Sequence, residues 1–412
     1  MMRLIKEMRR LENQESIVLT TPAIDFAGIW GEGRQLERTS PYWDAVHTYP
    51  ILRLPGVSFE KTQNLLQLTE YQNLFQRAKE LGLEKSTIDF FVRQGPLIEG
   101  FFDKNYGVLA KKIAGRFSLT LQDVNFSHCT YLPYANVLYN LILSSELKIP
   151  TFITPFLHSQ NPRYDLEACV DVLSKYTGIF CCTEEEKRFL QKQGLSAEKL
   201  FVLPMGVDFD KFQAPKKDKF QDLYGKLSPY VLFCGHKNFE KGAITLLHAL
   251  RELYREGHNL GAVFIGASSY SFDIEYGKLR KECPDMTLLN FTPQNLSGYF
   301  DWKKIAAFNE ALCYAMVSRS DAYGIAYLEA WACGIPVIAA DIPAMHEVVS
   351  PNKDGFLVPF DDPHALASKL LHYLQNPEDA RVMGARGREK VRKRHQWYKI
   401  AEKTFEIVKA LI

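Results

Sequence analysis

Short apolar runs alternate with helical patterns along most of this 412-residue chain. The runs are rich in Val, Ile, Leu and Phe and are bounded by polar or turn-forming residues, which is typical of buried strands. In the first half they predict strands at Ser16–Thr21, His47–Leu54, Asp123–His128, Thr151–Thr154, Gly178–Cys182 and Leu200–Leu203. In the second half they predict strands at Tyr230–Cys234, Ala262–Ile265, Met286–Leu289, Cys313–Val317 and Val337–Ala339. Helical patterns such as Tyr164–Lys175 and Glu184–Lys192 lie between them, so we expect parallel sheets with helices on both faces.

A break in this alternation predicts two α/β domains, each doubly wound and Rossmann-like. The break is Pro204–Asp208 (PMGVD), and a polar, Lys-rich stretch at Lys211–Lys219 follows it. We therefore expect one domain over residues 1–204, a second over 205–395 and a final helix over 396–412. Ligands bind at the carboxyl ends of strands in such sheets, which predicts a cleft between the domains.

Residues 56–116 depart from the alternation and are largely helical in pattern. They carry many aromatic side chains: Phe59, Tyr71, Phe75, Phe90, Phe91, Phe101 and Phe102. Aromatics at helical spacing usually face a core, which is the favoured interpretation. The alternative is a surface that binds an acceptor or faces a membrane.

Composition excludes several classes of protein. Hydrophobic residues make up 46% of the chain, which is ample for sizeable cores and excludes disorder over most of it. The 50 Lys and Arg residues nearly balance the 48 Asp and Glu residues, whereas a dedicated nucleic-acid binder usually has a strong basic excess. No apolar stretch is long enough to span a membrane, and the charged N-terminus does not resemble a secretory signal. The eight cysteines have no zinc-site spacing, so we expect buried thiols and a cytoplasmic protein.

The segment Ser318–Val348 carries the most chemical information. Asp321 and Glu329 are separated by seven residues, and Gly324 between them opens a helical run. A helix N-terminus offers N–H groups and a positive dipole end, which suits a pyrophosphate. Glu329 could accept hydrogen bonds from a ribose diol, and Asp321 would lie where a sugar on the pyrophosphate sits. The alternatives are a helix cap made by Asp321 or Ser320 and a solvent-facing charge at Glu329.

This segment and several others in the chain resemble the sequences of a known family. The stretch DAYGIAYLEAWACGIPVIAADIPAMHEVV resembles the donor-site signature of family-4 glycosyltransferases, retaining enzymes of the GT-B fold (glycosyl transferases group 1). GHKNFEKGAITLLHAL at 235–250 resembles the family's G-R-x-x-x-E-K-G segment, and VLPMGVDFDKF at 202–212 resembles its hinge. Residues 354–370 and 381–391 resemble its C-terminal helices, while 147–158 and 179–195 resemble parts of its N-terminal domain. The resemblance covers roughly residues 120–412.

The resemblance implies a fold and a set of roles. The fold would be GT-B, with an N-terminal acceptor domain, a C-terminal nucleotide-sugar donor domain and a last helix that crosses back to the first. On the donor side, Glu329 would bind the ribose, Asp321 the sugar hydroxyls and Lys241 the diphosphate. The pyrophosphate would be cradled by the backbone of Tyr323, Gly324, Ile325 and Ala326.

Two histidines also match family positions. His158 would lie near the reacting centre, and His128 would lie on the acceptor side. For both, the alternative is a histidine that only stabilises the fold; for Lys241 it is a solvated lysine.

The resemblance further implies front-face retaining transfer, in which the leaving phosphate helps to deprotonate the acceptor hydroxyl. The sequence has no evident Ser-His-Asp or Cys-His nucleophile and no metal-binding D-x-D in a matching context. The protein's share would then be positioning and electrostatics. We expect no metal and no cofactor; the nucleoside-diphosphate sugar is a substrate.

The sequence departs from the family pattern at three places. Asp321 replaces a glutamate, which retracts the carboxylate by ~1.5 Å, about one C–C bond. His236 replaces an arginine, so its charge at the phosphates would depend on pH, and Lys237 beside it could compensate. At the N-terminus, Leu4–Leu11 resembles the end of the family's first helix, and its first strand and Gly-Gly loop are missing. We expect the natural gene product to begin upstream.

The sequence thus predicts a retaining glycosyltransferase that moves a sugar from a nucleoside-diphosphate sugar to a hydroxyl of a glycan, a lipid-linked acceptor or a small molecule. One alternative is a catalytically inactive GT-B protein that binds a nucleotide or a partner; another is a sugar-nucleotide epimerase. The basic stretch Arg386–Arg394 could contact anionic lipids at the inner face of a membrane, or be a solvated helix face.

Overall fold

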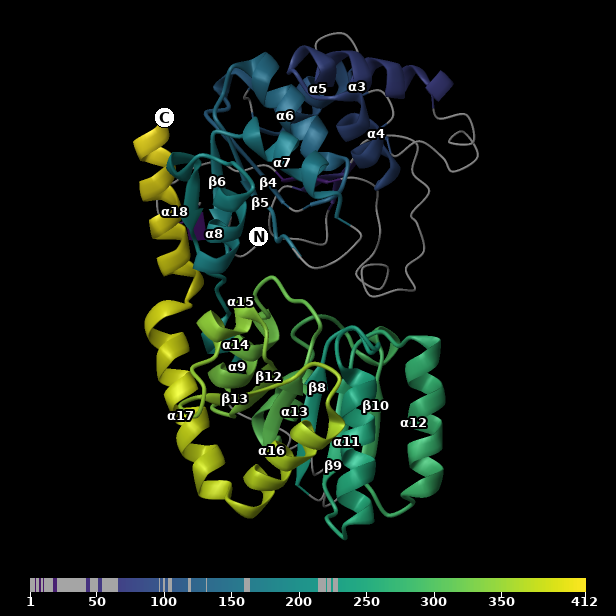
Figure 1. The fold of residues 1–412 in the computed structure, drawn as a ribbon. Helices are drawn as coiled ribbons and strands as arrows, with labels where there is room; N and C mark the ends of the chain where they lie inside the picture. The colour runs from purple at the N-terminus through teal and green to yellow at the C-terminus, as the bar shows by residue number, and fades with distance from the viewer. Residues whose placement is uncertain are drawn as a thin grey trace. The chain divides into compact units, whose positions relative to one another are not determined.

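A computed structural model describes residues 66–95, 97–98, 101–102, 106–117, 120–130, 132–158, 164–213, 220, 224 and 229–412, with short pieces before residue 66. The described residues form two compact units (Figure 1). Unit 1 holds those up to Leu203 together with Ala401–Ile412, and unit 2 holds Pro204–Ile400. The cleft between domains stays a prediction.

Unit 2 is built on one parallel sheet. Its strands are β8 (Tyr230–Cys234), β9 (Gly261–Ile265), β10 (Leu288–Phe291), β11 (Cys313–Met316), β12 (Val337–Ala340) and β13 (Gly355–Val358). Their order is β10-β9-β8-β11-β12-β13, and every pair of neighbours is parallel. The strand order reverses between β8 and β11, and the carboxyl ends of the strands beside such a reversal are where ligands bind.

Helices cover both faces of this sheet. One group packs together: α11 (Ala243–Arg255), α12 (Tyr270–Glu282) and α16 (Pro363–Gln375). A second group packs together: α9 (Phe209–Phe212), α13 (Trp302–Glu310), α14 (Ile325–Ala332) and α17 (Pro377–Arg394). Right-handed crossovers on either side of the order reversal place the two groups on opposite faces. The short helix α15 (Pro343–Val348) precedes β13, and η5 (Pro293–Asn295) follows β10.

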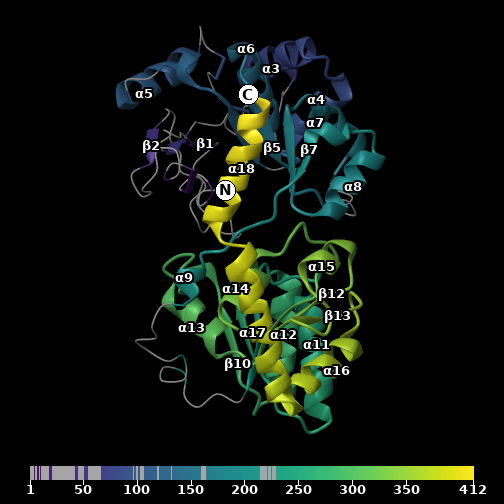
Figure 2. The same cartoon turned by 90° about the vertical axis from the view of Figure 1, so that its left-hand side faces the viewer.

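The close packing of α17 on α14 depends on glycine (Figure 2). A Cβ atom on Gly387 would lie 1.9 Å from the ring of Trp331, which is fully buried. No larger side chain fits there without moving a helix. The packing of α17 therefore fixes the position of α14, whose N-terminus lies at the carboxyl edge of the sheet.

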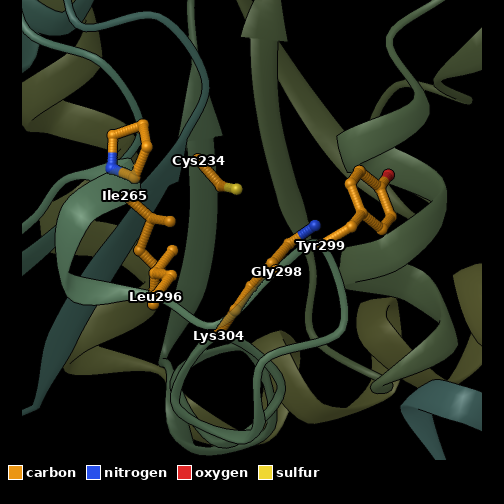
Figure 3. Close-up of a pocket in the computed structure, with 8 residues that line it drawn as sticks. Cys234, Ile265, Leu296, Gly298, Tyr299 and Lys304 are labelled. Atoms are coloured by element: carbon orange, nitrogen blue, oxygen red, sulfur yellow. The ribbon is translucent and has the colours of Figure 1, made fainter. Parts of the chain in front are cut away.

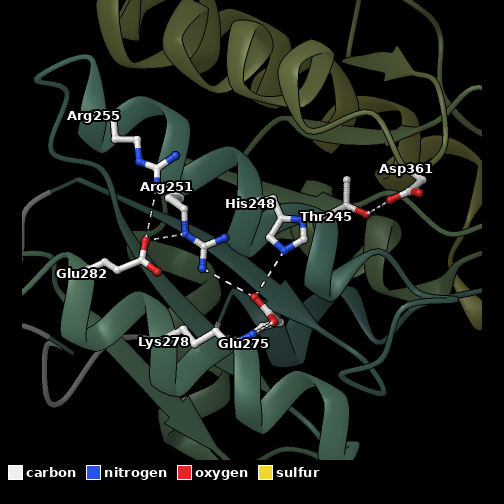
Figure 4. Close-up of polar contacts among 8 residues, drawn as sticks. All are labelled: Thr245, His248, Arg251, Arg255, Glu275, Lys278, Glu282 and Asp361. Atoms are coloured by element: carbon white, nitrogen blue, oxygen red, sulfur yellow. Dashed lines mark hydrogen bonds and ion pairs between the residues drawn. The ribbon is translucent and has the colours of Figure 1, made fainter.

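Ion pairs tie α11 to α12 at the surface (Figure 4). The Arg251 guanidinium lies 2.8 Å from Glu282 and 3.5 Å from Glu275. Lys278 and His248 also contact the Glu275 carboxylate, at 2.7 and 3.4 Å. These contacts are far along α11 from its N-terminal Ala243, so they stabilise the layer of helices rather than a site at the sheet edge.

Unit 1 contains a second parallel sheet of order β4-β5-β6-β7. Its strands are β4 (Ser127–Thr130), β5 (Thr151–Thr154), β6 (Gly178–Cys181) and β7 (Leu200–Val202). Around it lie α6 (Asn136–Leu147), α7 (Leu166–Ser174), α8 (Glu184–Lys192), η3 (Leu121–Asp123) and η4 (Ala197–Lys199). A smaller sheet pairs β1 (Val18–Thr20) parallel with β3 (Ile51–Arg53) and β2 (Tyr42–Asp44) antiparallel with β3. The chain ends with α18 (Trp397–Leu411).

The aromatic region is helical, as the sequence predicts, with α3 (Thr69–Glu80), α4 (Lys85–Arg93) and α5 (Gly107–Phe117). Its aromatic side chains belong to the core of unit 1, the favoured interpretation: Tyr71, Phe91 and Phe101 are buried, and Phe75, Phe90 and Phe102 pack against them. The alternative of an exposed acceptor or membrane surface is wrong for these residues. Phe59 lies outside the described residues.

Several element predictions need correction. The strand expected at Asp123–His128 begins only at Ser127, because a Thr120–Asp123 capping box closes a 3₁₀ turn before it. The strand expected at Met286–Leu289 is β10, two residues later. The stretch 354–370, expected to be helical, begins with the strand β13 and only then becomes α16.

The cysteine prediction is confirmed. All eight thiols are free, and every one except Cys333 is buried. None of the helices that the structure describes combines the length and the apolar character that crossing a membrane requires.

Candidate active site

The N-terminus of α14 opens at the carboxyl edge of the unit 2 sheet. Its N-cap is Gly324, in the left-handed region with φ +79° and ψ 66°, and no side chain caps the helix. A Cβ atom on this residue would lie 2.4 Å from the Tyr327 ring, so only glycine fits. A cap made by Asp321 or Ser320 is therefore wrong. The first turn at Ile325 and Ala326 has no acidic residue beside the positive end of the helix dipole.

Asp321 and Lys241 meet beside this helix end although 80 residues separate them in the chain. Lys241 Nζ donates to Asp321 Oδ2 over 3.0 Å, and the side chains are 28% and 11% exposed. The other carboxylate oxygen accepts a 3.3 Å bond from the Tyr323 N–H. A cation, a carboxylate and a helix N-terminus thus share one partly exposed place, where a ligand can reach all three.

A side-chain amide organises the loop that carries Lys241. Asn238 Oδ1 accepts from the Lys241 N–H over 2.8 Å, and Asn238 Nδ2 donates to His236 Nδ1 over 2.9 Å. Gly242 packs so tightly that a Cβ would lie 2.5 Å from the Val317 carbonyl oxygen. The loop between β8 and α11 is thereby fastened to the end of β11. The sequence analysis did not single out Asn238.

His236 and Lys237 have different surroundings. Desolvation, with Lys241 and Lys237 nearby, lowers the pKa of His236, and its place at the phosphates stays a prediction. Lys237 is fully buried, and its ammonium donates to the side chain of Asn290 and, over 3.1 Å, to the Phe291 carbonyl. Burial lowers its pKa to about 8. Because the Lys237 ammonium already donates to two groups of β10, its placement does not favour contact with a phosphate.

Glu329 is only 2% exposed, which contradicts the alternative of a solvent-facing charge. Its Oε1 accepts from the Tyr299 hydroxyl at 2.5 Å and from Lys304 Nζ at 2.9 Å. Burial alone would lower the pKa of Lys304, but the Glu329 carboxylate and neighbouring thiols outweigh it and raise that pKa. Burial and Glu329 raise the pKa of Tyr299 well above its ordinary value.

Tyr299 and Lys304 also form one wall of a pocket (Figure 3). Its other lining residues come from the ends of β8 and β9 and from the segment after β10: Cys234, Ile265, Gly266, Pro293, Leu296 and Gly298. The lining is mostly apolar, with the Lys304 ammonium reaching toward Tyr299. Sequence reasoning missed both wall residues, although Lys304 stands in helical phase with buried Ala307 and Phe308.

Tyr323 turns its side chain away from this edge. Its ring is buried, and its hydroxyl lies 3.2 Å from His395 Nδ1. That nitrogen is also 3.1 Å from the Met205 carbonyl oxygen, and burial lowers the pKa of His395 to about 4. What Tyr323 offers the site is its backbone, whose N–H contacts Asp321 here.

His158 belongs to unit 1, on the segment after β5. The preceding Leu157 N–H donates over 3.0 Å to the carboxylate of Glu186 on α8, and the Cys182 N–H donates to the same carboxylate over 2.6 Å. Phe156 adopts a left-handed φ of +49°, so this carboxylate holds a strained segment in place. The role of His158 stays a prediction, and Glu186 was not foreseen.

His128, the other unit 1 histidine, is held inside the sheet. Its Nε2 lies 2.9 Å from Thr154 Oγ1, and its ring meets the Phe180 ring edge-on at 5.2 Å. Burial lowers its pKa to about 3. These contacts agree with a histidine that stabilises the fold, and its acceptor role stays a prediction.

The structure thus brings Lys241, Asp321, Glu329 and the Gly324–Ala326 backbone together in unit 2. Within the described ranges, no group of three or more His, Cys, Asp or Glu side chains is placed to hold a metal ion. The basic stretch at Arg386–Arg394 is largely paired: Arg392 and Lys393 contact Glu389, and Lys390 contacts Asp354.

The chain is similar to known proteins over part of its length. Residues 216–390 match the family described as glycosyl transferases group 1. This segment belongs to that family. The chain is 28% identical over 235 residues to D-inositol 3-phosphate glycosyltransferase of Xylanimonas cellulosilytica, covering 54% of each. It is 29% identical over 239 residues to the GDP-mannose-dependent α-(1-6)-phosphatidylinositol monomannoside mannosyltransferase of Mycolicibacterium smegmatis, covering 55% of this chain and 58% of the relative.

The chain therefore spans little more than half the length of these curated relatives. Its likeness to a solved structure, Anabaena HepE in complex with UDP and glucose, extends over 99% of this chain and 95% of that one. The TM-score is 0.67 at 12% identity, which is evidence of fold alone. With the parallel sheets described above, it confirms the predicted GT-B fold.

Proposed function

We propose that this chain is a retaining glycosyltransferase that moves a sugar from a nucleoside-diphosphate sugar to an acceptor hydroxyl. The observation that carries the proposal is the meeting of Lys241 and Asp321 at the uncapped N-terminus of α14. The Lys241 ammonium and the first-turn N–H groups would bind the diphosphate. Without a nucleotide, Lys241 forms its ion pair with the Asp321 carboxylate. When the nucleotide binds, its diphosphate would replace Asp321 as the partner of Lys241.

These groups match the charge that develops in the reaction. When the bond between the sugar and the diphosphate breaks, the leaving group gains negative charge, and a fixed cation and helix dipole stabilise it. Asp321 would then accept hydrogen bonds from hydroxyls of the donor sugar. Because Lys241 and the helix supply positive charge, the proposal needs no metal, and EDTA should leave turnover unchanged.

The remaining donor contacts follow from the same edge of the sheet. Glu329 would bind the ribose, and the neighbouring apolar pocket would take the base. The names of the two relatives include an inositol phosphate and a phosphatidylinositol mannoside. They support an acceptor hydroxyl on a polyol or a lipid headgroup, and with it a peripheral membrane contact.

The first test is a thermal-shift panel with UDP, GDP, ADP and TDP on the wild-type chain and on Glu329→Ala. A nucleotide at a hundred times its Kd should stabilise the protein by ~2.7 kcal/mol. We expect one of them to do so and the variant to lose the effect. Glu378→Ala is the matched control, because Glu378 is an exposed glutamate on α17 whose side chain is 70% exposed.

The second test is turnover. The donor sugar of the nucleotide identified should be transferred, or slowly hydrolysed, and NMR should find the anomeric configuration retained. No shift with any nucleotide would contradict the proposal. A shift without turnover would favour a binding protein that has lost catalysis, and inversion would refute the retaining mechanism.

A further inference from the structure

Glu329 sits in a buried cluster with Lys304 and Tyr299. The side chains of Glu329 and Lys304 are 2% and 5% exposed. A buried carboxylate without a partner takes up a proton, because desolvation disfavours its charged form. The Lys304 ammonium gives the buried Glu329 carboxylate an ionic partner, with Nζ 2.9 Å from Oε1.

The cluster also constrains the orientation of the carboxylate. Both the Tyr299 hydroxyl and Lys304 Nζ donate to the same oxygen, Oε1, at 2.5 and 2.9 Å. Lys304 is itself fixed: its Nζ lies 3.8 Å from the centre of the Tyr299 ring and within 6 Å of two further rings, Phe212 and Phe308, at 5.8 and 5.7 Å. With one oxygen held on this side, the carboxylate has a defined rotation.

We propose that Lys304 and Tyr299 are positioning residues that hold Glu329 by Oε1 and so leave Oε2 to accept the ribose hydroxyls of the nucleotide. The inference rests on the proposed function and extends it to two residues of the pocket wall (Figure 3). Recognition of ribose, as distinct from the base or the phosphates, then depends on a lysine and a tyrosine that come from outside the helix carrying Glu329.

The experiment compares affinities for ribose and for a sugar without hydroxyls. Calorimetry on the wild type, Lys304→Met and Lys304→Arg would use UDP, GDP and ADP and their 2′,3′-dideoxy counterparts. Hydrogen bonds to a charged group correspond to a preference of about 10- to 100-fold for the ribonucleotide in the wild type. Lys304→Met should bring this ratio close to one, and Lys304→Arg should restore much of it.

The conservative variant separates positioning from general damage. Lys304→Arg keeps a cation that can donate to Glu329, so it should keep much of the ribose preference that Lys304→Met loses. Tyr299→Phe removes only a hydroxyl and should lower the ratio less. It also carries the test if Lys304→Met does not fold.

Lys390→Met is the matched control. Lys390 Nζ lies 2.5 Å from Asp354 and 4.2 Å from the centre of the Trp331 ring, so it is a second lysine in unit 2 that pairs with a carboxylate over an aromatic ring. We expect this variant to lose stability and keep the ribose preference.

The outcomes distinguish the two claims. An unchanged ratio in Lys304→Met, or in Tyr299→Phe where that variant carries the test, overturns this inference and leaves the proposed function intact. A lowered ratio in Lys390→Met overturns it too, because the effect would belong to any buried lysine. A wild-type protein that binds none of the diphosphates overturns the proposed function and this inference with it.

Discussion

Helices α14 and α8 both begin just beyond the carboxyl end of a parallel strand, but their N-termini are filled differently. At α8 the Thr183 hydroxyl caps the Glu186 N–H over 3.0 Å, and the first turn carries three glutamates. At α14 the cap is a glycine without a side chain, and the first turn has no acidic residue. The first turn of α8 thus has a side-chain cap and acidic residues of its own, and the first turn of α14 has neither.

The carboxylates near the two helix ends do different work. Glu186 bonds two backbone N–H groups and fixes the segment before His158. Asp321 bonds a partly exposed lysine that a ligand can reach. The comparison teaches that a helix N-terminus without a cap stands out as a candidate site when another helix of the same chain has a side-chain cap and acidic residues there.

The largest effect should come from Gly324→Ala. The new Cβ would meet the Tyr327 ring at 2.4 Å, and φ is +79°, so we expect a loss of about 2–4 kcal/mol in unfolding free energy together with nucleotide binding. Gly194→Ala is the control: φ there is +95°, but nothing lies within 4 Å of the new Cβ, so only about 1 kcal/mol of strain is added. Denaturant unfolding and calorimetry measure both. Undiminished nucleotide binding by Gly324→Ala would break the comparison.

Next in size is Lys241→Met, which removes the cation beside α14. We expect affinity for a nucleoside diphosphate to fall by about 10- to 100-fold, while affinity for the bare nucleoside stays unchanged. Asp321→Asn should bind the diphosphate normally and lose turnover with the sugar donor. If Lys241→Met lowered the affinities for the nucleoside and the nucleoside diphosphate equally, Lys241 would not act on the phosphates, which would contradict the comparison of the two helix ends.

A pH effect should report the closed end at α8. Burial raises the pKa of Glu186 to about 7, above its ordinary 4.5, even though two backbone N–H groups oppose the shift. The native state therefore holds this proton more tightly than the unfolded state, so the contribution to stability grows as pH falls through 7 and is complete below 4.5.

Glu186→Gln removes this titration. Between pH 8 and pH 5 the wild type should gain about 2–3 kcal/mol relative to the variant. Thermal unfolding across that range measures the difference. Parallel profiles for the two proteins would show that Glu186 titrates normally and that the α8 end is not sealed as described.

The smallest effect should come from Arg251→Met, on α11 (Figure 4). Its ion pairs to Glu275 and Glu282 lie near the surface, so a loss of about 1 kcal/mol or less is expected. Nucleotide affinity should not change. A change in affinity would mean that the α14 site responds to general loosening of unit 2, which would weaken every binding comparison above.

Local pattern was enough to predict much of the fold. The bounds predicted for β5, β8 and α8 agree with the structure residue by residue. These elements are continuous apolar runs or a helix with a clear Thr cap, so their signals lie within a few neighbouring residues. β13 was missed because its four residues stand directly before a strong helical pattern and were read as part of it.

The site was predicted in part for the same reason. Asp321, Gly324 and Glu329 lie within nine residues, and their spacing along one loop and helix is visible in the chain. Tyr299 and Lys304 were not predicted as site residues. Lys304 lies on α13 and Tyr299 on the segment before it, 25 and 30 residues away from Glu329 in the chain. Lys237 was expected at the phosphates because it follows His236; its ammonium donates to the Phe291 carbonyl of β10, and its role at the donor stays a prediction.

The sequence by itself determined the parallel α/β architecture, the GT-B resemblance and the residue types of the donor site, because periodicity, caps and turns act over short stretches of chain. The tertiary structure alone decided which charges are paired, which are buried and which remain open. It joined Lys241 to Asp321 and Lys304 to Glu329, and it placed the Glu186 carboxylate against the N–H of Leu157. Pairing and desolvation depend on groups that are distant in sequence and adjacent only after the chain has folded.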